Sequence, residues 1–278
     1  MFRKSFFAFA FVALAAVSAT AQTADEIIAK HVTAMGGMAK LNAVKSMRLT
    51  GKMTVGPGIE APAIIEFKRP KNVRLEITLQ GMTAVQAYDG ANAWQIMPFQ
   101  GNKNPEAMGE DERKNMEEEA DFVEGPLVNY KAKGHKVELI GKDKVEGSDA
   151  YKLKITLKNG DVQTVYLDAD TFLAVKAEGK RMVRGSEVET ESFSGDYKEV
   201  EGLMIPHSLE AGQKGSPQRQ RITIEKVEIN PAVEDARFKM PEVKKAEGNA
   251  PAAKPENKES ETKPAGKKPE PGKKPPVG

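Results

Sequence analysis

Apolar and polar residues alternate along most of the chain after Ser46. Apolar side chains occupy every second position from Val73 to Leu79 and again from Tyr151 to Leu157. A period of two is typical of strands with one face in the core and the other in water. Asp89-Gly90 and Asn159-Gly160 lie between such stretches and predict hairpin turns. We therefore predict about 10 or 11 strands, joined mostly by short hairpins into one large antiparallel sheet.

The alternation changes phase in the last of these stretches. Ile222 and Ile224 hold one phase, whereas Val227 and Ile229 hold the other. One extra residue in a strand produces such a shift, so the pattern predicts a β-bulge near Glu225-Lys226. Because bulges bend strands, we expect the sheet to be curved.

A helix precedes the strands. Thr23, with Glu26 three residues later, has the sequence of a capping box, and Gly36-Gly37 is a helix stop. A second, shorter helix is predicted from Met38 to Val44. The first helix has an apolar face with the helical period, made by Ile27, Ile28, His31, Val32 and Met35.

Residues 104–133 interrupt the strand pattern and are rich in Glu and Met. Asn104-Pro105 has the residue types of a helix N-cap and first helical position, and Gly125-Pro126 divides the segment. We predict one or two helices here. Together with the N-terminal helix they are expected to cover one face of the sheet, which gives an α+β fold that is mainly β.

The first 21 residues have the pattern of an export signal. Arg3 and Lys4 precede an uncharged apolar stretch from Phe6 to Val17, and Ala19-Thr20-Ala21 matches an A-x-A cleavage site before Gln22. The alternative is a membrane anchor, but an apolar run of about a dozen residues is shorter than the roughly 20 that span a bilayer. We predict a signal peptide over residues 1–21, cleaved after Ala21, and a periplasmic protein.

The whole sequence lacks cysteine, and Gln22 follows the predicted cleavage site. The mature N-terminus therefore cannot carry a thioether-linked lipid, and no disulfide can form. A hydrophobic core must stabilise the body, residues 22–242, and a body of about 220 residues is large enough for one. We expect a soluble monomer.

Residues 243–278 have a different composition. They hold no aromatic residue and repeat Lys-Pro pairs, as at Lys263-Pro264. Such a segment buries too little apolar surface to offset its ordering entropy, so we predict a disordered Lys/Pro-rich tail, either a solvated spacer or a cationic arm for anionic envelope polymers. Its nine Lys and five Glu make it +4 and the signal is +2, which leaves −4 for the body of a chain with net charge +2. A slightly acidic body argues against a nucleic-acid partner.

Candidate catalytic and metal-binding residues are few. His31, His135 and His207 lie at no metal-ligand spacing, and neither a G-x-S-x-G elbow nor a phosphate-binding loop occurs. Asp168 and Asp170 lack the other oxygen ligands of a calcium loop and predict a tight turn. We expect no enzyme, no catalytic residue, no metal site and no cofactor, although the sequence leaves open a buried pair of carboxylates.

Several short segments resemble the LolA/LolB family of outer-membrane lipoprotein carriers. The segments are Phe67-Lys68-Arg69-Pro70, the alternating stretch Val73 to Leu79, Tyr88-Asp89-Gly90, Ala93 to Phe99, and Asp235 to Pro241. Their order and spacing both fit the family. The resemblance implies a half-open β-barrel closed by helices, with an apolar interior that shields the acyl chains of a lipoprotein.

The resemblance also implies site residues. Arg69 matches an arginine that holds the lid through hydrogen bonds to backbone oxygens, although a solvated strand-end role remains open. The residues predicted to contact the ligand are Leu75, Ile77, Trp94, Ile96 and Phe99. Each of these could instead be an ordinary core residue.

The resemblance favours a periplasmic carrier for lipoproteins or a similar acylated ligand, moving from an inner-membrane donor to an outer-membrane acceptor. Two features depart from the short carriers: the longer second half, including residues 185–202, and the Lys-Pro tail. The alternative is a non-enzymatic envelope sensor or scaffold that uses the same fold to bind a protein partner.

Overall fold

The computed structural model describes residues 22–121, 123–183 and 185–242. The predicted signal peptide and the predicted tail lie outside these residues. The described helices are α1 (Ala24–Ala34), α2 (Met38–Ala43) and α3 (Glu110–Glu119), with short 3-10 helices η1 (Pro98–Gln100) and η2 (Asp235–Arg237). The strands are β1 (Ser46–Gly56), β2 (Ile59–Lys68), β3 (Asn72–Leu79), β4 (Met82–Tyr88), β5 (Ala93–Met97), β6 (Asn102–Ala107), β7 (Lys136–Val145), β8 (Ser148–Thr156), β9 (Val162–Asp168), β10 (Ala174–Val183), β11 (Ser186–Val200), β12 (Leu203–Gln213) and β13 (Arg219–Ile229).

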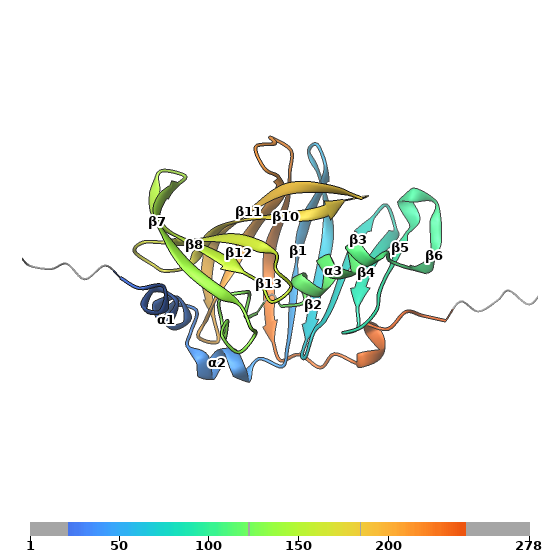
Figure 1. Ribbon diagram of the computed structural model, residues 1–278. Helices are drawn as coiled ribbons and strands as arrows, with labels where there is room; N and C mark the ends of the chain where they lie inside the picture. The colour runs from blue at the N-terminus through green and yellow to red at the C-terminus, as the bar shows by residue number, and fades with distance from the viewer. Residues whose placement is uncertain (1–21, 122, 184, 243–278) are drawn as a thin grey trace, which may run out of the picture. The chain divides into compact units, whose positions relative to one another are not determined.

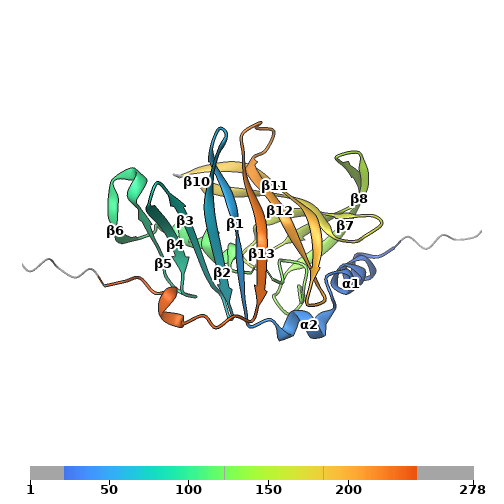
Figure 2. The same ribbon diagram turned by 180° about the vertical axis from the view of Figure 1, so that it is seen from behind.

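The described strands form one 13-stranded sheet with the order β6-β5-β4-β3-β2-β1-β13-β12-β11-β10-β9-β8-β7. Every neighbouring pair is antiparallel. The chain runs outward from β1 to the β6 edge, crosses to the β7 edge, and returns strand by strand to β13, which pairs with β1 (Figures 1 and 2). The sheet is curved and open, which confirms the predicted fold class.

The strand count exceeds the prediction, and one of the additional strands is β6. Asn104-Pro105, which we predicted to begin a helix, lies within this strand. Pro has no N–H to donate to a ladder, but an edge strand has one unpaired side and tolerates it. The prediction of a helix start at this dipeptide is therefore wrong.

The bulge predicted in the last strand is confirmed. Thr50 pairs with Lys226 and Gly51 with Ile224, so Glu225 is the extra residue on β13. The backbones of β1 and β13 approach closely here, which explains why residue 51 is glycine. A Cβ on Gly51 would lie 1.9 Å from the carbonyl oxygen of Thr223. Bulge and glycine together allow the two central strands to bend.

The two faces of the sheet are covered by different parts of the chain. We call the face that carries Met47 and Val73 the inner face, because these side chains pack in one core cluster with Leu41 of α2 and Met116 of α3. A second inner-face cluster places Ile27 and Ile28 of α1 against β8 and β9. The opposite face, which carries Arg48 and Arg74, is the outer face. In Figure 1 α3 lies in front of the central strands, and in Figure 2 these strands lie in front of it.

The N-terminal helices follow the predicted caps. The Thr23 side-chain oxygen accepts from the Glu26 N–H at 3.3 Å, and the Glu26 carboxylate accepts from the Thr23 N–H at 2.9 Å. Gly36 and Gly37, with φ of 114° and 84°, end α1 and turn the chain into α2. No helix within the described residues is long and apolar enough to cross a membrane.

Residues 108–121 and 123–135 connect the β6 edge to the β7 edge, and we call them the crossover. A chain that leaves one edge of an open sheet and rejoins at the other must pass over a face, and the crossover passes over the inner one. Its helix begins later than predicted, after Gly109, whose N–H donates to Glu112 at 2.9 Å. The described residues beyond Glu119 form turns, including Gly125 with φ of 58°.

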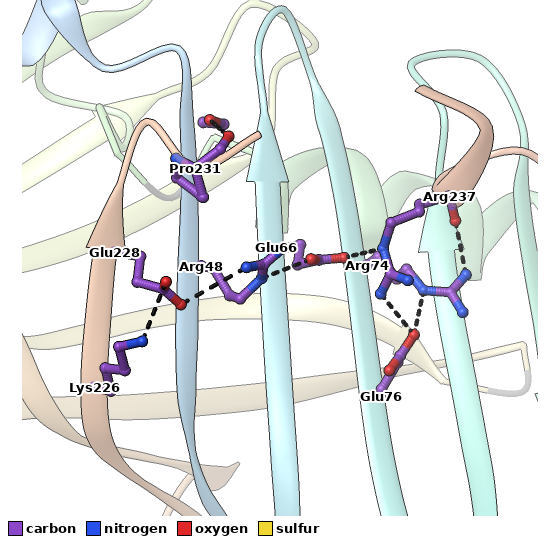
Figure 3. A network of polar contacts seen from close by, with 9 residues as sticks. Arg48, Glu66, Arg74, Glu76, Lys226, Glu228, Pro231 and Arg237 are labelled. Carbon is purple, nitrogen blue, oxygen red and sulfur yellow. Dashed lines mark hydrogen bonds and ion pairs between the residues drawn. The ribbon is translucent and has the colours of Figure 1, made fainter. Parts of the chain in front are cut away.

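Residues 231–238, which we call the clasp, return over the outer face. Trp94 donates its indole N–H to the Phe238 carbonyl at 2.7 Å, and Phe238 is fully buried. Arg237 joins a network on this face in which Glu66 accepts from Arg237 at 2.6 Å and from Arg48 at 2.8 Å (Figure 3). The Glu66 carboxylate is almost completely buried, so the clasp holds the outer face through desolvated contacts.

Candidate ligand cavity

A cavity of about 210 Å³ lies between the helices, the crossover and the inner face of β9–β12. The crossover contributes Val123, residues 124–126 and Leu127. The side chains around it are mainly apolar and include Met35, Leu41, Val165, Leu203, Ile205 and Leu209. A larger hollow of about 670 Å³ lies beside Glu60, Glu210, Arg219 and Arg221, and its charged lining does not suit an apolar ligand.

Besides the charged Glu124 and Lys176, four polar residues border the cavity: His31 from α1, and Ser192, Ser194 and Tyr197 from β11. Ser192 and Ser194 share a face because they are two residues apart on a strand. Asp196 has φ of 48°, and this left-handed residue interrupts the alternation before Tyr197. An apolar cavity with a few grouped polar atoms is the usual form of a small-molecule site.

His31 is buried and neutral in this setting. Its Nδ1 lies 2.8 Å from the Phe172 carbonyl oxygen, which can only accept, so Nδ1 carries the proton. Burial lowers the pKa of His31 below its ordinary value, although the hydrogen bond to Phe172 raises it in part. The neutral ring therefore leaves Nε2 as a hydrogen-bond acceptor.

Tyr197 is fixed by its own hydroxyl. That hydroxyl donates to the Ala174 carbonyl oxygen at 2.7 Å. Burial raises the pKa of Tyr197 to about 12, so the hydroxyl stays protonated at neutral pH. Tyr197 thus closes one wall of the cavity without adding charge.

The crossover is attached to both halves of the sheet by polar contacts. Glu117 of α3 pairs with Lys71 at 2.9 Å beside β3, and Glu119 pairs with Arg181 of β10 at 3.0 Å. All four side chains are more than a third exposed. Met116 is the buried residue of α3, so this helix contributes little apolar burial to its own attachment.

Arg69 joins the helices to the crossover. Its Nε donates to the Val44 carbonyl at 2.6 Å, and Nη2 donates to the Leu41 carbonyl at 3.0 Å. Its Nη1 pairs with Glu124 at 2.5 Å. One planar guanidinium therefore binds the end of α2 and the cavity wall together. A role in lid control stays a prediction.

Buried carboxylates accompany these contacts. Burial raises the pKa of Asp121, and the hydrogen bond from Lys133 offsets only part of the effect. For Glu124, burial also raises the pKa, but hydrogen bonds from Arg69 and Lys133 outweigh it and hold the pKa below its ordinary value. The crossover thus carries its own charged groups close to the apolar cavity.

The predicted ligand-binding residues lie on two faces. Leu75 pairs with Ile65 and Ile77 with Ala63 on the inner face, where both are half-buried beyond the border of the cavity. Contact of Leu75 and Ile77 with a ligand stays a prediction.

The other three predicted residues lie elsewhere. Trp94 pairs with Ala87 and Ile96 with Val85, and these four form a small apolar cluster on the outer face. Phe99 lies in η1 and is 43% exposed. One cavity cannot include both faces of a sheet, so the five residues do not form a single site.

Sequence reasoning missed the polar group of His31, Ser192, Ser194 and Tyr197. His31 stands on the apolar face of α1, which was a usable signal, because a polar residue at a core position needs a partner. The β11 residues gave no such signal. Within the described residues no group of three or more His, Asp or Glu side chains could hold a metal ion.

Solved structures of other proteins have a fold similar to that of this chain. A LolA superfamily protein from Nitrosomonas europaea is 15% identical, with a TM-score of 0.51 over 79% of this chain and 98% of that one. The chain has the fold of the LolA superfamily. No protein-family model matches the sequence, and no curated protein is similar to it in sequence.

Two further structures have similar scores. A DUF1329 family protein from Desulfovibrio piger is 15% identical, with a TM-score of 0.52 over 79% of this chain and 98% of that one. A protein from Vibrio parahaemolyticus, described as an outer membrane lipoprotein-sorting protein domain, is 12% identical, with a TM-score of 0.51 over 77% of this chain and 94% of that one. At such identities the likeness concerns the LolA-superfamily fold alone.

Proposed function

We propose that residues 22–242 form an exported, non-enzymatic carrier for an acylated ligand, a lipoprotein or a similar lipid-like molecule. The ligand occupies the cavity between the helices, the crossover and β9–β12. The carrier works in the periplasm, between an inner-membrane donor and an outer-membrane acceptor. The observation that carries the proposal is the apolar cavity beneath a crossover whose helix α3 is attached largely by exposed ion pairs.

The cavity favours hydrocarbon. Each CH₂ group that leaves water for an apolar site contributes roughly 0.8 kcal/mol. Its volume of about 210 Å³ is below the range of about 300–1,000 Å³ that is usual for ligand sites. A whole acyl chain therefore requires the crossover to move outward. Since α3 packs against β3, that movement extends the apolar space toward Leu75 and Ile77.

The location in the proposal is supported by the export pattern of residues 1–21 and by the absence of cysteine. The lipoprotein class is supported by the description of the similar Vibrio domain. Both Trp94 and Ile96 face away from the proposed ligand, so we assign them to the clasp side of the molecule.

Native mass spectrometry with a synthetic N-acyl, S-diacylglyceryl cysteine peptide tests the carrier function. The mature protein, residues 22–278, is expected to bind one peptide, and the same peptide without acyl chains is expected not to bind. Equal binding of both peptides, or of neither, would contradict the proposal. Binding of a protein partner without acyl uptake would favour the scaffold alternative.

A reversible lock tests the role of the crossover. The chain lacks cysteine, so Glu119→Cys with Arg181→Cys provides two unique thiols at an exposed pair. Joined by a short disulfide-containing crosslinker, this variant is expected to lose acyl uptake and to regain it after reduction. The double variant without crosslinker is the control. Unchanged uptake in the locked form would show that the crossover is not the entrance.

A further inference from the structure

Among the polar side chains that border the cavity, His31 has a hydrogen-bond acceptor, Nε2, that receives no hydrogen bond. Nδ1 is engaged by the Phe172 carbonyl, whereas Nε2 has no hydrogen-bond partner among the described residues. Among the described residues, Nε of Arg219 is the side-chain nitrogen that has no hydrogen-bond partner and is fully enclosed by protein. Nε2 of His31 also has no partner, but it is not fully enclosed. His31 is 6% exposed and borders the cavity, and its Nε2 is not fully enclosed, so the cavity is the space from which a ligand would reach Nε2.

We propose that the cavity selects acylated ligands whose polar end carries a hydrogen-bond donor, an amide N–H or a hydroxyl, and that Nε2 of His31 accepts this bond. The inference rests on the proposed carrier function and adds the ligand's polar group and the residue that recognises it. His31 is a specificity-determining residue in this scheme.

Among the described residues, no protein group donates a hydrogen bond to Nε2 of His31. The Tyr197 hydroxyl proton is committed to Ala174, and the ammonium of Lys176, a residue that also borders the cavity, is paired with Glu178 at 2.7 Å and Glu191 at 3.1 Å. A ligand without a donor leaves a buried acceptor unpaired, which is unfavourable.

The same geometry disfavours an ionised carboxylate. A carboxylate offers acceptors only, and a neutral His31 offers it another acceptor. The pKa of His31 is held below its ordinary value by burial, so the ring gains no charge at neutral pH that would attract an anion. Ser192 and Ser194 have hydroxyls that either donate or accept, and they suit the carbonyl that adjoins an amide.

A matched pair of probes tests the proposal. N-methyltetradecanamide has one N–H donor, and methyl tetradecanoate has the same chain length without a donor. Calorimetric titration of the mature protein at pH 7.5, a buffer value that keeps a histidine neutral, is expected to give about tenfold tighter binding of the amide. His31→Phe keeps an aromatic ring but removes the acceptor, so this variant is expected to bind both probes equally.

His135→Phe is the matched control, because His135 is the last residue of the crossover before β7 and is absent from the cavity border. It is expected to keep the tenfold preference. Equal binding of the two probes by the native protein would overturn the proposal while leaving the carrier function intact. Binding of neither probe would overturn both.

A measurement on the native protein covers the possibility that His31→Phe does not fold. In ¹⁵N spectra of the imidazole rings, His31 is expected to show a protonated Nδ1 and a bare Nε2. Addition of the amide is expected to shift the Nε2 resonance, and addition of the ester is not. An Nε2 resonance that is unchanged by a bound amide would contradict the proposal.

Discussion

The clasp and the crossover both cover a face of the same sheet, but they are attached differently. In the clasp, Phe238 is fully buried, and Glu66, 2% exposed at its side chain, holds Arg237. In the crossover, α3 buries Met116 and otherwise relies on pairs such as Glu119–Arg181, in which both side chains are more than a third exposed, whereas the turns that follow α3 are anchored by the buried Leu127 and Val128. Desolvated contacts are expensive to break one at a time, whereas exposed pairs contribute little.

Under the proposed function, this difference marks the clasp as a part of the fold that stays in place and α3 as the part of the crossover that moves. The clasp covers Trp94 on the outer face, where the Phe238 carbonyl accepts the indole N–H. The crossover closes the inner face over a cavity. A segment that must open for a ligand has to come from the less stable end of the structure.

The largest expected effect is on the clasp. Glu66→Ala leaves Arg48 and Arg237 without their buried partner. Breaking a buried ion pair from one side costs about 3–5 kcal/mol, and we expect the lower end, about 3 kcal/mol, because both arginines retain some water. Urea unfolding measures the change. Acyl uptake per folded molecule is expected to stay unchanged.

Glu228→Ala is the control for this prediction. Glu228 contacts Arg48 at 3.7 Å and Lys226 at 3.2 Å on the same face, but its side chain is 32% exposed. Its removal is expected to cost less than about 1 kcal/mol. Similar losses for Glu66 and Glu228 would show that burial does not distinguish the clasp.

Much of the clasp side could be predicted from sequence. Strict alternation from Val73 to Leu79 gave the faces of β3, and the phase change at Glu225 gave the bulge, because both follow from the period of a strand. The placement of Trp94 and Ile96 required the pairing register, which no local pattern contains. Their position on the outer face follows from pairing with Ala87 and Val85.

The crossover was predicted less well. Its composition indicated one or two helices within 104–133, divided at Gly125-Pro126, but the structure has a strand, α3 and a series of turns. Connecting two edges of a wide sheet requires an extended path more than a continuous helix, and that demand comes from the strand order. The cavity residues Ser192 and Tyr197 lie about 60 residues beyond the crossover, so only the folded chain brings them together.

Arg69 lies between the strongly attached clasp and the weakly attached α3 in this comparison. Its substitution is expected to have the next largest effect on stability. Arg69→Ala leaves the Leu41 and Val44 carbonyls at the end of α2 without a donor, and we expect a loss of about 1–2 kcal/mol. Hydrogen exchange in α2 and release of a bound acyl peptide are both expected to accelerate. Arg69→Lys is expected to restore little, because one ammonium cannot match the planar fork. Lower stability with unchanged release would place Arg69 with the clasp.

The smallest effect on stability and the sharpest test of the comparison come from Glu119→Gln. Loss of the exposed pair with Arg181 is expected to cost less than about 0.5 kcal/mol, yet the pair spans the crossover and β10, so acyl exchange is expected to quicken about twofold. Added salt screens the same pair, and should therefore quicken exchange more in the native protein than in the variant. Stopped-flow displacement of a fluorescent acyl chain measures both. Glu225→Gln, which breaks a similarly exposed pair with Lys52 between β13 and β1, is the matched control and is expected to change neither rate. If Glu225→Gln quickened exchange equally, surface charge in general would set the rate, and the crossover would have no special part in opening.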